Sequence, residues 1–253
     1  MRHISFSALK IWKECAFRYK LNYIDDLRKF SGNEFTAFGT AIHEACERKV
    51  LDITVDEVKV FTDKFTEELS RIPEDIQINQ TLITEMKVQG EELAAAAWDA
   101  LRSYFGSFTV VSAEEELLQH IEDTEFQFKG YVDLIIQTAD GKYHIIDWKS
   151  CSWGWDMSKK NDAMTNYQLT LYKHFFSKIK GIDPKEVETH FALLKRTAKK
   201  NKIELFRVTS GPKKVDNALK ILNNAVYNIQ KEIFPKNKLN CKYCEFYKTK
   251  ECP

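Results

Sequence analysis

Two short apolar segments carry acidic residues where a β-sheet would normally hold only apolar side chains. VDLII and YHIIDW lie on either side of the turn sequence ADGK, within residues 130–150. The first contains Asp133, the second contains Asp147, and Lys149 follows two residues later. Apolar, β-branched runs joined by a turn predict a β-hairpin. Such a hairpin would bring two carboxylates and one ammonium group together.

Two carboxylates on neighbouring strands can share one divalent cation. Neighbouring strands lie about 4.8 Å apart, so Asp133 and Asp147 on one face would reach the same ion. Mg²⁺ prefers oxygen ligands and keeps bound waters. Residues i and i+2 of a strand face the same side, which places Lys149 over the same ion and its water. The pattern predicts a metal site, although an isolated D-x-K is more often a surface salt bridge.

Hydrophobic periodicity predicts the elements that would position this site. Helices are expected over residues 5–24, 37–51, 55–71, 82–105, 164–181 and 212–233. Strand character appears over residues 108–121, 125–136 and 143–150, and residues 189–208 predict a further hairpin with a basic tip. Helices, then a mostly consecutive sheet, then helix, strands and helix predict an α/β or α+β domain.

Composition and charge limit the classes of function. The chain has 253 residues, about right for one large domain or one domain with a small attachment. Its net charge of +1 means that nucleic-acid binding would have to come from a local basic strip. No run approaches the roughly 18 apolar residues of a membrane span, and the N-terminus lacks a signal-peptide core. We therefore expect a cytoplasmic protein with no membrane contact.

Further residues of the kinds found in metal-dependent hydrolases lie on both sides of the hairpin. They are His43, which closes the segment GTAIH, the glutamates Glu114, Glu115 and Glu116, and the pair Gln168 and Tyr172. The pair is spaced i and i+4, so both side chains share one face of a helix. Taken alone, His43 would more often be a helix-packing histidine, and the pair a polar residue beside a core tyrosine.

The C-terminal segment CKYCEFYKTKEC has the cysteine spacing of a metal site. Its three cysteines, Cys241, Cys244 and Cys252, are separated by two and by seven residues. A segment this small cannot be stabilised by apolar burial alone, so a bound metal would stabilise its fold. In a chain that is not exported, cysteines are thiols or ligands rather than disulfides. A fourth ligand is needed, and spacing does not choose among Cys15, Cys46 and Cys151.

Five of these segments, in this order, resemble the motifs of the PD-(D/E)XK nuclease superfamily, specifically its RecB-like branch. The branch includes the nuclease domains of RecB and AddB, the small CRISPR-associated nucleases and eukaryotic relatives with an iron–sulfur cluster. Its pattern is G-x-x-x-H, an acid, G-x-x-D, D-x-K and Q-x-x-x-Y. The matching segments are GTAIH (39–43), the EEE run (114–116), GYVD (130–133), DWK (147–149) and QLTLY (168–172). The resemblance implies a restriction-endonuclease-like core, a central mixed sheet flanked by helices.

The resemblance also implies roles for the residues of the hairpin. Asp133 and Asp147 would bind Mg²⁺ or Mn²⁺ together with the backbone carbonyl of Trp148. His43 would be a further metal ligand or a close neighbour of the metal. Lys149 would orient or activate the attacking water and balance charge on the phosphate.

The remaining motif residues have less specific implied roles. Gln168 and Tyr172 would position the scissile strand or brace the metal site. Glu114 matches the family's acidic strand position best, whereas Glu116 would share its face by the two-residue period of a strand.

The resemblance selects the fourth cysteine ligand as well. In the AddB and CRISPR types, one N-terminal and three C-terminal cysteines hold a [4Fe–4S] cluster, and Cys15 stands at the lone N-terminal position. The cluster would join the first helix to the tail and close the domain into a ring around the active site. Zn²⁺ on the same four thiolates is the alternative, because the last spacing exceeds the common five residues. We expect a nuclease domain over residues 1–235, a cluster-binding tail over residues 236–253, and ordinary thiols at Cys46 and Cys151.

These features predict a metal-dependent DNA exonuclease of recombination or repair that prefers single strands or free ends. Any helicase would be a separate partner chain, because the sequence contains no GxxxxGK[ST] phosphate loop. The alternatives are an end-trimming or flap endonuclease of CRISPR spacer capture or recombination, and a DNA-binding module with a vestigial nuclease site. DNA contacts are expected from Trp153, Trp155 and the basic tip, Lys195, Arg196, Lys199, Lys200 and Lys202.

Overall fold

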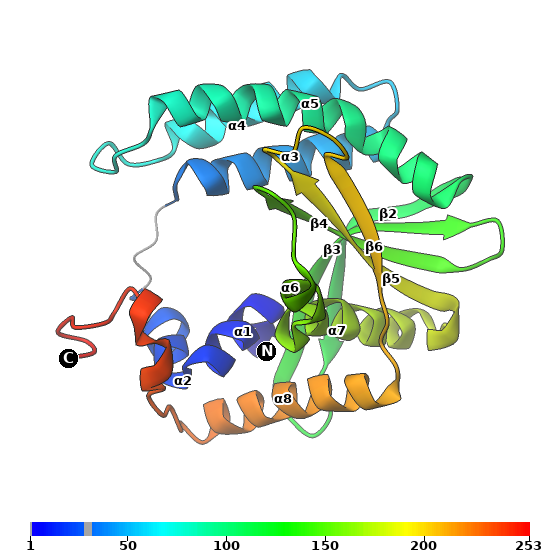
Figure 1. The fold of residues 1–253 in the computed structure, drawn as a ribbon. Helices are drawn as coiled ribbons and strands as arrows, with labels where there is room; N and C mark the ends of the chain where they lie inside the picture. Colours follow the sequence, from blue (N-terminus) through cyan, green and yellow to red (C-terminus); the bar gives the residue numbers. More distant parts are fainter. Residues whose placement is uncertain (1, 28–31) are drawn as a thin grey trace. The chain divides into compact units, whose positions relative to one another are not determined.

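The computed structural model describes residues 2–27 and 32–253, and the chain divides into two compact units. Unit 1 comprises Met1–Phe30, Glu116–Gly130 and Ser210–Pro253, and unit 2 comprises Ser31–Glu115 and Tyr131–Thr209. Figure 1 follows the elements along the chain. None of the described helices is both long enough and apolar enough to cross a bilayer.

Unit 2 begins with three helices that pack on one another, α3 (Glu34–Leu51), α4 (Glu57–Ser70) and α5 (Gln80–Phe105). Asn33 starts α3 with a capping box, in which its side chain accepts the Thr36 N–H and the Thr36 hydroxyl oxygen accepts the Asn33 N–H. This cap explains why α3 begins three residues before the predicted start.

An aromatic cluster holds the three helices together. The ring centroids of Phe38, Phe61 and Phe65 lie 5.4 to 5.9 Å apart. A Cβ at Gly90 of α5 would lie 1.9 Å from Cζ of Phe61, so only glycine lets that ring pack against the helix. The packed helices carry the residues that face the sheet.

The strands of unit 2 form a mixed sheet. The β3 (Phe126–Thr138) and β4 (Tyr143–Cys151) strands pair antiparallel, β4 pairs parallel with β5 (Val187–Lys195), and β5 pairs antiparallel with β6 (Ile203–Val208). The whole sheet has the order β1-β3-β4-β5-β6, and β2 (Phe108–His120) pairs with β3. Both predicted hairpins are confirmed, and so is the mixed α/β architecture.

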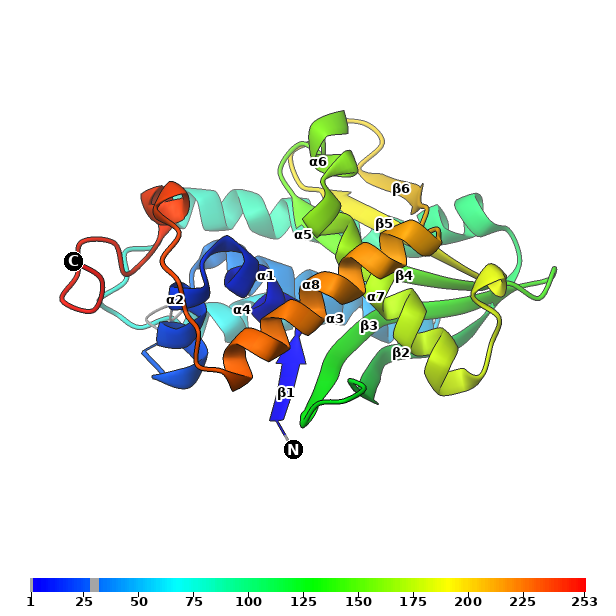
Figure 2. The same cartoon turned by 90° about the horizontal axis from the view of Figure 1, so that it is seen from below.

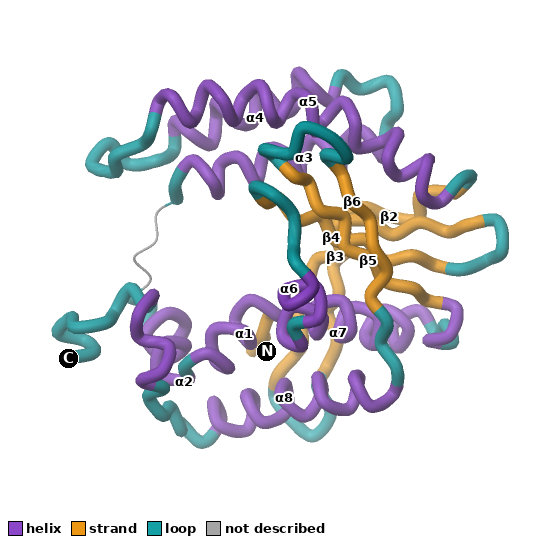
Figure 3. The backbone as a smooth tube through the Cα atoms, viewed as in Figure 1, coloured by secondary structure: helices purple, strands orange, loops and turns teal. Residues whose placement is uncertain are grey.

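A crossover makes the parallel β4–β5 pairing possible, because parallel neighbours need a connection that returns to the same end of the sheet. It consists of α6 (Met157–Asn161), α7 (Ala163–Lys180) and the short 3₁₀ segment η2 (Pro184–Glu186). Gly181 ends α7 in the left-handed conformation, with φ of 65°. In unit 2, α7 covers the sheet face opposite to α3–α5 (Figure 3).

Unit 1 contains the N-terminal and C-terminal segments of the chain. The β1 strand (Arg2–Ser5) pairs parallel with the first residues of β3, and α1 (Phe6–Glu14) packs against α8 (Pro212–Gln230), beside it in Figure 2. The α2 helix (Ala16–Tyr19), the π-helical η1 (Lys20–Ile24) and the 3₁₀ segment η3 (Lys238–Tyr243) complete the unit. Neither β1 nor the short α6 was predicted, because each is only four or five residues long.

The predicted helix over residues 5–24 is not continuous. Cys15 adopts an extended conformation, with φ of −163° and ψ of 112°, and separates α1 from α2. The side chains of Asn237 and Asn240 donate hydrogen bonds to the carbonyl oxygen of Glu14, at 2.9 and 2.6 Å. Residues from the other end of the sequence therefore satisfy the backbone at the interruption, which hydrophobic periodicity could not reveal.

Candidate active site

The two aspartates of the DWK and GYVD motifs face each other across the β3–β4 hairpin. Leu134 pairs with Ile146, so Asp133 and Asp147 occupy the next opposed positions, about 5 Å apart in such a ladder. Asp147 is 1% exposed. Burial raises the pKa of both carboxyl groups, and the charge of Asp147 raises that of Asp133 further. A buried and a half-buried acid that face each other form a site that favours a cation.

Lys149 lies beside this pair, as the two-residue period of a strand predicts. Its Nζ is 2.7 Å from Oδ2 of Asp147. Burial works to lower the lysine pKa, but the charges of Asp147 and Asp133 outweigh it and raise the pKa above the ordinary value. The ammonium group is therefore charged at neutral pH.

The backbone of Trp148 and the ring of His43 surround Asp133. The Trp148 N–H donates to Oδ2 of Asp133 at 2.7 Å, and Nδ1 of His43 lies 3.6 Å from the same oxygen. The His43 ring also hydrogen-bonds the backbone of Trp148. Burial, and then the charge of Lys149, lower the pKa of His43 to about 4. The imidazole is therefore neutral at pH 7, the state in which it can bind a metal.

Gln168 and Tyr172 of α7 contact the other aspartate. The Gln168 side-chain N–H₂ donates to Oδ1 of Asp147 at 2.7 Å and to Oη of Tyr172 at 3.2 Å. Burial raises the pKa of Tyr172 above its usual range, so its phenol stays protonated. The geometry favours bracing of Asp147 over direct strand contact for this pair.

Glu114 differs from the two glutamates that follow it. Its backbone is left-handed, with φ of 49°. This interrupts the two-residue alternation by which Glu116 was expected to share the face of Glu114. Glu115 pairs with Lys180 at 2.8 Å, and Glu116 pairs with Lys129 at 3.0 Å. Burial raises the pKa of Glu114, and the charges of Glu47 and Asp147 raise it further. Glu114 is therefore the glutamate of the run that faces the acidic site.

A cavity of about 530 Å³ adjoins the site and adds residues that sequence reasoning missed. Its lining is Gly39, Thr40, His43, Glu44, Glu47, Arg48, Lys64 and Glu114. Arg48 and Lys64 both pair with Glu44, at 2.8 and 3.6 Å. Glu47 lies one helical turn after His43, on the same face of α3. The spacing H-x-x-x-E was the signal that could have identified it.

Glu114 provides a direct test of this arrangement. We expect Glu114→Gln to lower the rate of DNA cleavage about 10- to 100-fold, the usual effect of removing a group next to metal ligands. Glu116→Gln, the matched control, should leave the rate within about twofold. Initial rates on a labelled oligonucleotide would check this, and equal losses in both variants would contradict the assignment.

The raised pKa of Asp133 predicts a pH dependence of the metal-free protein. The folded-state pKa lies above the unfolded value, so this group stabilises the fold below about pH 4 and loses that contribution as pH rises through the folded pKa. In a chelator, wild type should therefore lose melting temperature relative to Asp133→Asn between about pH 5 and pH 8. The asparagine oxygen can still accept the Trp148 N–H.

Adding Mg²⁺ at about pH 8 supplies the control for this effect. The ion should raise the melting temperature of wild type and have little effect on Asp133→Asn. If the melting temperatures of wild type and Asp133→Asn differed by the same amount at about pH 5 and at about pH 8, a raised pKa of Asp133 would be excluded.

The basic tip of the β5–β6 hairpin presents fewer exposed basic side chains than the expected DNA-binding strip. Lys195 pairs with Glu204, Lys202 pairs with Glu92, and the buried Arg196 donates to Gln89 at 2.9 Å. Only Lys199 and Lys200 of the five are exposed side chains. Three of the basic side chains thus serve packing within unit 2, and the strip is smaller than predicted.

The two tryptophans after the DWK motif also differ in their exposure. Trp153 is 77% exposed, whereas the Trp155 ring packs on Phe191 with centroids 5.0 Å apart. Only Trp153 is available to stack on an unpaired base.

The four cysteines of the predicted cluster all belong to unit 1 and line one cavity of about 360 Å³. They are Cys15, Cys241, Cys244 and Cys252. Cys46 is buried in the core of unit 2, and Cys151 lies in β4, also in unit 2. The structure therefore groups the four predicted ligands and keeps the two predicted ordinary thiols out of that cavity.

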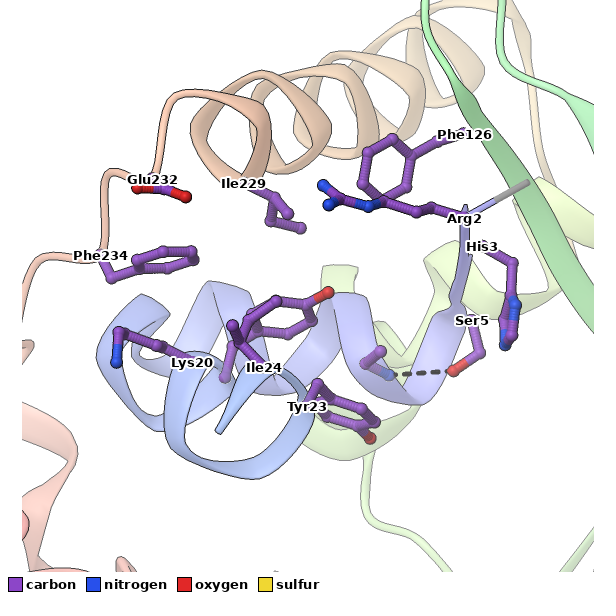
Figure 4. A pocket seen from close by; sticks show the side chains of 12 residues that line it. Arg2, His3, Ser5, Lys20, Tyr23, Ile24, Phe126, Ile229, Glu232 and Phe234 are labelled. Atoms are coloured by element: carbon purple, nitrogen blue, oxygen red, sulfur yellow. Dashed lines mark hydrogen bonds between the residues drawn. The ribbon is translucent and has the colours of Figure 1, made fainter. Parts of the chain in front are cut away.

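A larger cavity of unit 1, about 670 Å³, combines cationic and aromatic side chains. Arg2 and Lys20 line it together with Tyr23, Phe126 and Phe234. Figure 4 shows the Arg2 side chain extending beside Phe126 toward Ile229. Cations beside aromatic rings are the combination that binds unpaired nucleotides.

Comparison with known proteins identifies the family and the fold. The family model of the PD-(D/E)XK nuclease superfamily matches residues 3–249. A curated relative, one of the subunits of the ATP-dependent helicase/deoxyribonuclease of Streptococcus uberis, is 27% identical over 177 residues, or 67% of this chain and 16% of the relative. The chain thus spans about a sixth of that relative's length.

A solved structure from Eubacterium rectale, described as a "putative exonuclease", superimposes with a TM-score of 0.63 at 11% identity. The alignment covers 100% of this chain and 90% of that one, and at this identity it supports the fold alone. The ordered motifs, the mixed sheet and the match over nearly the whole chain lead to one conclusion. The chain belongs to the PD-(D/E)XK nuclease superfamily.

Proposed function

We propose that the chain is a Mg²⁺- or Mn²⁺-dependent deoxyribonuclease that degrades DNA from free, single-stranded ends. The observation that carries this proposal is the pair of the buried Asp147 and the half-buried Asp133, with Lys149 on the same face of the sheet. Burial raises the pKa of both carboxyl groups, and the charge of Asp147 raises that of Asp133 further. A divalent cation would balance this charge, so the residues present suit the metal that this superfamily typically uses.

Asp133 and Asp147 would hold the ion, with His43 and the Trp148 carbonyl as further ligands. When bound, the ion supplies positive charge at the phosphate and lowers the pKa of bound water. The charged Lys149 ammonium, 2.7 Å from Asp147, would orient the attacking water and balance charge on the phosphate. Gln168 fixes the orientation of Asp147 through its 2.7 Å hydrogen bond. Tyr172 stays protonated and supports Gln168.

The choice of DNA as the substrate is supported by the curated relative. The Streptococcus uberis protein is a subunit of an ATP-dependent helicase/deoxyribonuclease, and the Eubacterium rectale protein that shares the fold is described as a "putative exonuclease". The relative's name also includes an ATP-dependent helicase. Residues 1–253 contain no phosphate loop, so we propose that any strand separation is supplied from outside these residues.

Preference for single strands is supported by side chains that can stack on unpaired bases. Trp153 is exposed in unit 2, and the 670 Å³ cavity of unit 1 offers Tyr23 and Phe234 beside Arg2 and Lys20. Stacking contributes about 1–3 kcal/mol per base and needs bases that are not paired.

We also propose that the tail, residues 236–253, and Cys15 hold a structural [4Fe–4S] cluster. The four thiols share one cavity with the cations Arg18, Lys236 and Lys248, which suit an anionic cluster. Zn²⁺ on the same four thiolates is the alternative, and the iron and zinc content of the purified protein separates the two.

One cleavage assay tests the proposed function. Anaerobically purified protein is mixed with three labelled substrates, linear single strands, linear duplexes and circular single strands, each with Mg²⁺ or Mn²⁺. We expect release of short products from linear single strands first. Rapid nicking of the circles would indicate an endonuclease instead. Binding without cleavage in either metal, unchanged by Asp147→Asn, would indicate a vestigial site.

A further inference from the structure

Two histidines and a glutamate meet in the first halves of β4 and β5. His144 and Glu188 are directly paired in the parallel register, and His190 follows Glu188 by two residues on the same face. In the described part of the chain, this is the one group whose three ligand atoms all lie within 4.8 Å of one another. We propose that His144, Glu188 and His190 form a second metal site, selective for Zn²⁺.

The spacing of the three ligand atoms fits one small ion. Nδ1 of His144 lies 3.1 Å from Nε2 of His190, and each nitrogen lies 3.9 Å from Oε2 of Glu188. Nitrogen and oxygen ligands about 2.0–2.2 Å from a tetrahedral zinc are roughly 3.3–3.5 Å apart. Shifts of a few tenths of an ångström would therefore complete the site. Two imidazoles and a carboxylate form a ligand set that zinc prefers over magnesium.

The site is distinct from the nuclease carboxylates. His144 precedes Asp147 by three residues in the same strand, and side chains an odd number of residues apart point to opposite faces of a sheet. One ion therefore cannot be shared between the two sites. Tyr104 and Phe105 of α5 cover the histidines, with ring centroids 4.9 to 5.7 Å away.

Neighbouring polar groups hold His144 in the required orientation, whereas Nδ1 of His190 is buried without a hydrogen-bond partner. Nε2 of His144 lies 2.9 Å from the hydroxyl of Thr138, which is 2.5 Å from Oδ1 of Asp140. A proton on that nitrogen, donated to Thr138, leaves the lone pair of Nδ1 directed at the other two ligands. Such outer hydrogen bonds normally accompany metal-binding histidines.

The carboxylate of Glu188 is held in the same manner. Its Oε1 contacts Lys142 at 3.4 Å and Arg207 at 3.2 Å, which leaves Oε2 toward the histidines. The competing explanation is a direct N–H···N hydrogen bond between the two imidazoles, for which 3.1 Å is also a suitable distance. That explanation predicts no zinc binding, so the two are separated by experiment.

The experiment compares zinc content in three proteins, each with residues 1–253 and purified with the tail cofactor in place. They are wild type, His190→Gln and His120→Gln, the last a control at an exposed histidine of β2. Each is dialysed against the same buffered low concentration of Zn²⁺, and metal is counted per chain. We expect wild type and His120→Gln to hold one more zinc than His190→Gln, with at least about a 10-fold loss of affinity in the variant. Equal counts in all three would overturn the proposal.

Two further measurements keep the test decisive if His190→Gln fails to fold. Glu188→Gln keeps the side-chain volume and should also bind zinc at least about 10-fold more weakly. An anomalous-scattering map of wild-type crystals soaked in Zn²⁺ should show a peak about 2.0–2.2 Å from both histidine nitrogens. Absence of that peak at saturating zinc would overturn the proposal. The result does not depend on nuclease activity.

Discussion

Replacing Asp147 with asparagine is expected to lower the rate of DNA cleavage by about 1,000-fold or more at saturating Mg²⁺. Asp147 is 1% exposed, faces Asp133 across the hairpin, and receives contacts from both Lys149 and Gln168. The substitution removes one of two metal-binding carboxylates and the charge partner of the lysine. Single-turnover cleavage of a labelled single strand would measure the loss.

A matched control separates catalysis from folding. Asp99→Asn changes an exposed aspartate of α5 in the same unit, and it should leave the rate within about twofold. Asp147→Asn should still bind DNA. Cleavage that survives Asp147→Asn at more than about a tenth of the wild-type rate would refute the proposed active site.

Replacing Cys15 with serine is expected to abolish cluster binding and to destabilise unit 1 by several kcal/mol. Structural metal sites contribute on the order of 10 kcal/mol of folding free energy in small domains, and serine is a poor ligand for iron. Cys15 lies at the interruption between α1 and α2, where Asn237 donates its N–H to Sγ at 3.4 Å. Iron content, the visible absorption of the cluster and the melting temperature would all report the loss.

Cys151→Ser is the matched control, because that thiol lies in β4 and outside the cysteine cavity. It should retain full iron content and absorption. If Cys15→Ser retained them too, another residue would have to be the fourth ligand. One zinc per chain in place of iron would support the zinc alternative and leave the prediction for Asp147 unchanged.

Local patterns in the sequence were sufficient to predict the elements that carry the active-site residues. Alternating apolar residues and a turn predicted the β3–β4 hairpin, and the period of two placed Lys149 beside Asp147. The i, i+4 spacing placed Gln168 and Tyr172 together on α7. These relations hold because strand and helix geometry alone decides which near neighbours share a face.

Contacts between distant segments were decided only in the tertiary structure. The helix over residues 5–24 breaks at Cys15 because Asn237 and Asn240 bind the Glu14 carbonyl. Lys195 and Lys202 are paired because β6 and α5 bring Glu204 and Glu92 to them.

Tertiary structure also decided which glutamate faces the active site. It likewise brought together His144, Glu188 and His190. Glu114 faces the acidic site because its left-handed backbone interrupts the alternation of β2. His144 meets His190, 46 residues away, because an α-helical crossover makes β4 and β5 parallel neighbours. Sequence spacing carries no information about such pairs, since strand order and register arise from packing of the whole sheet.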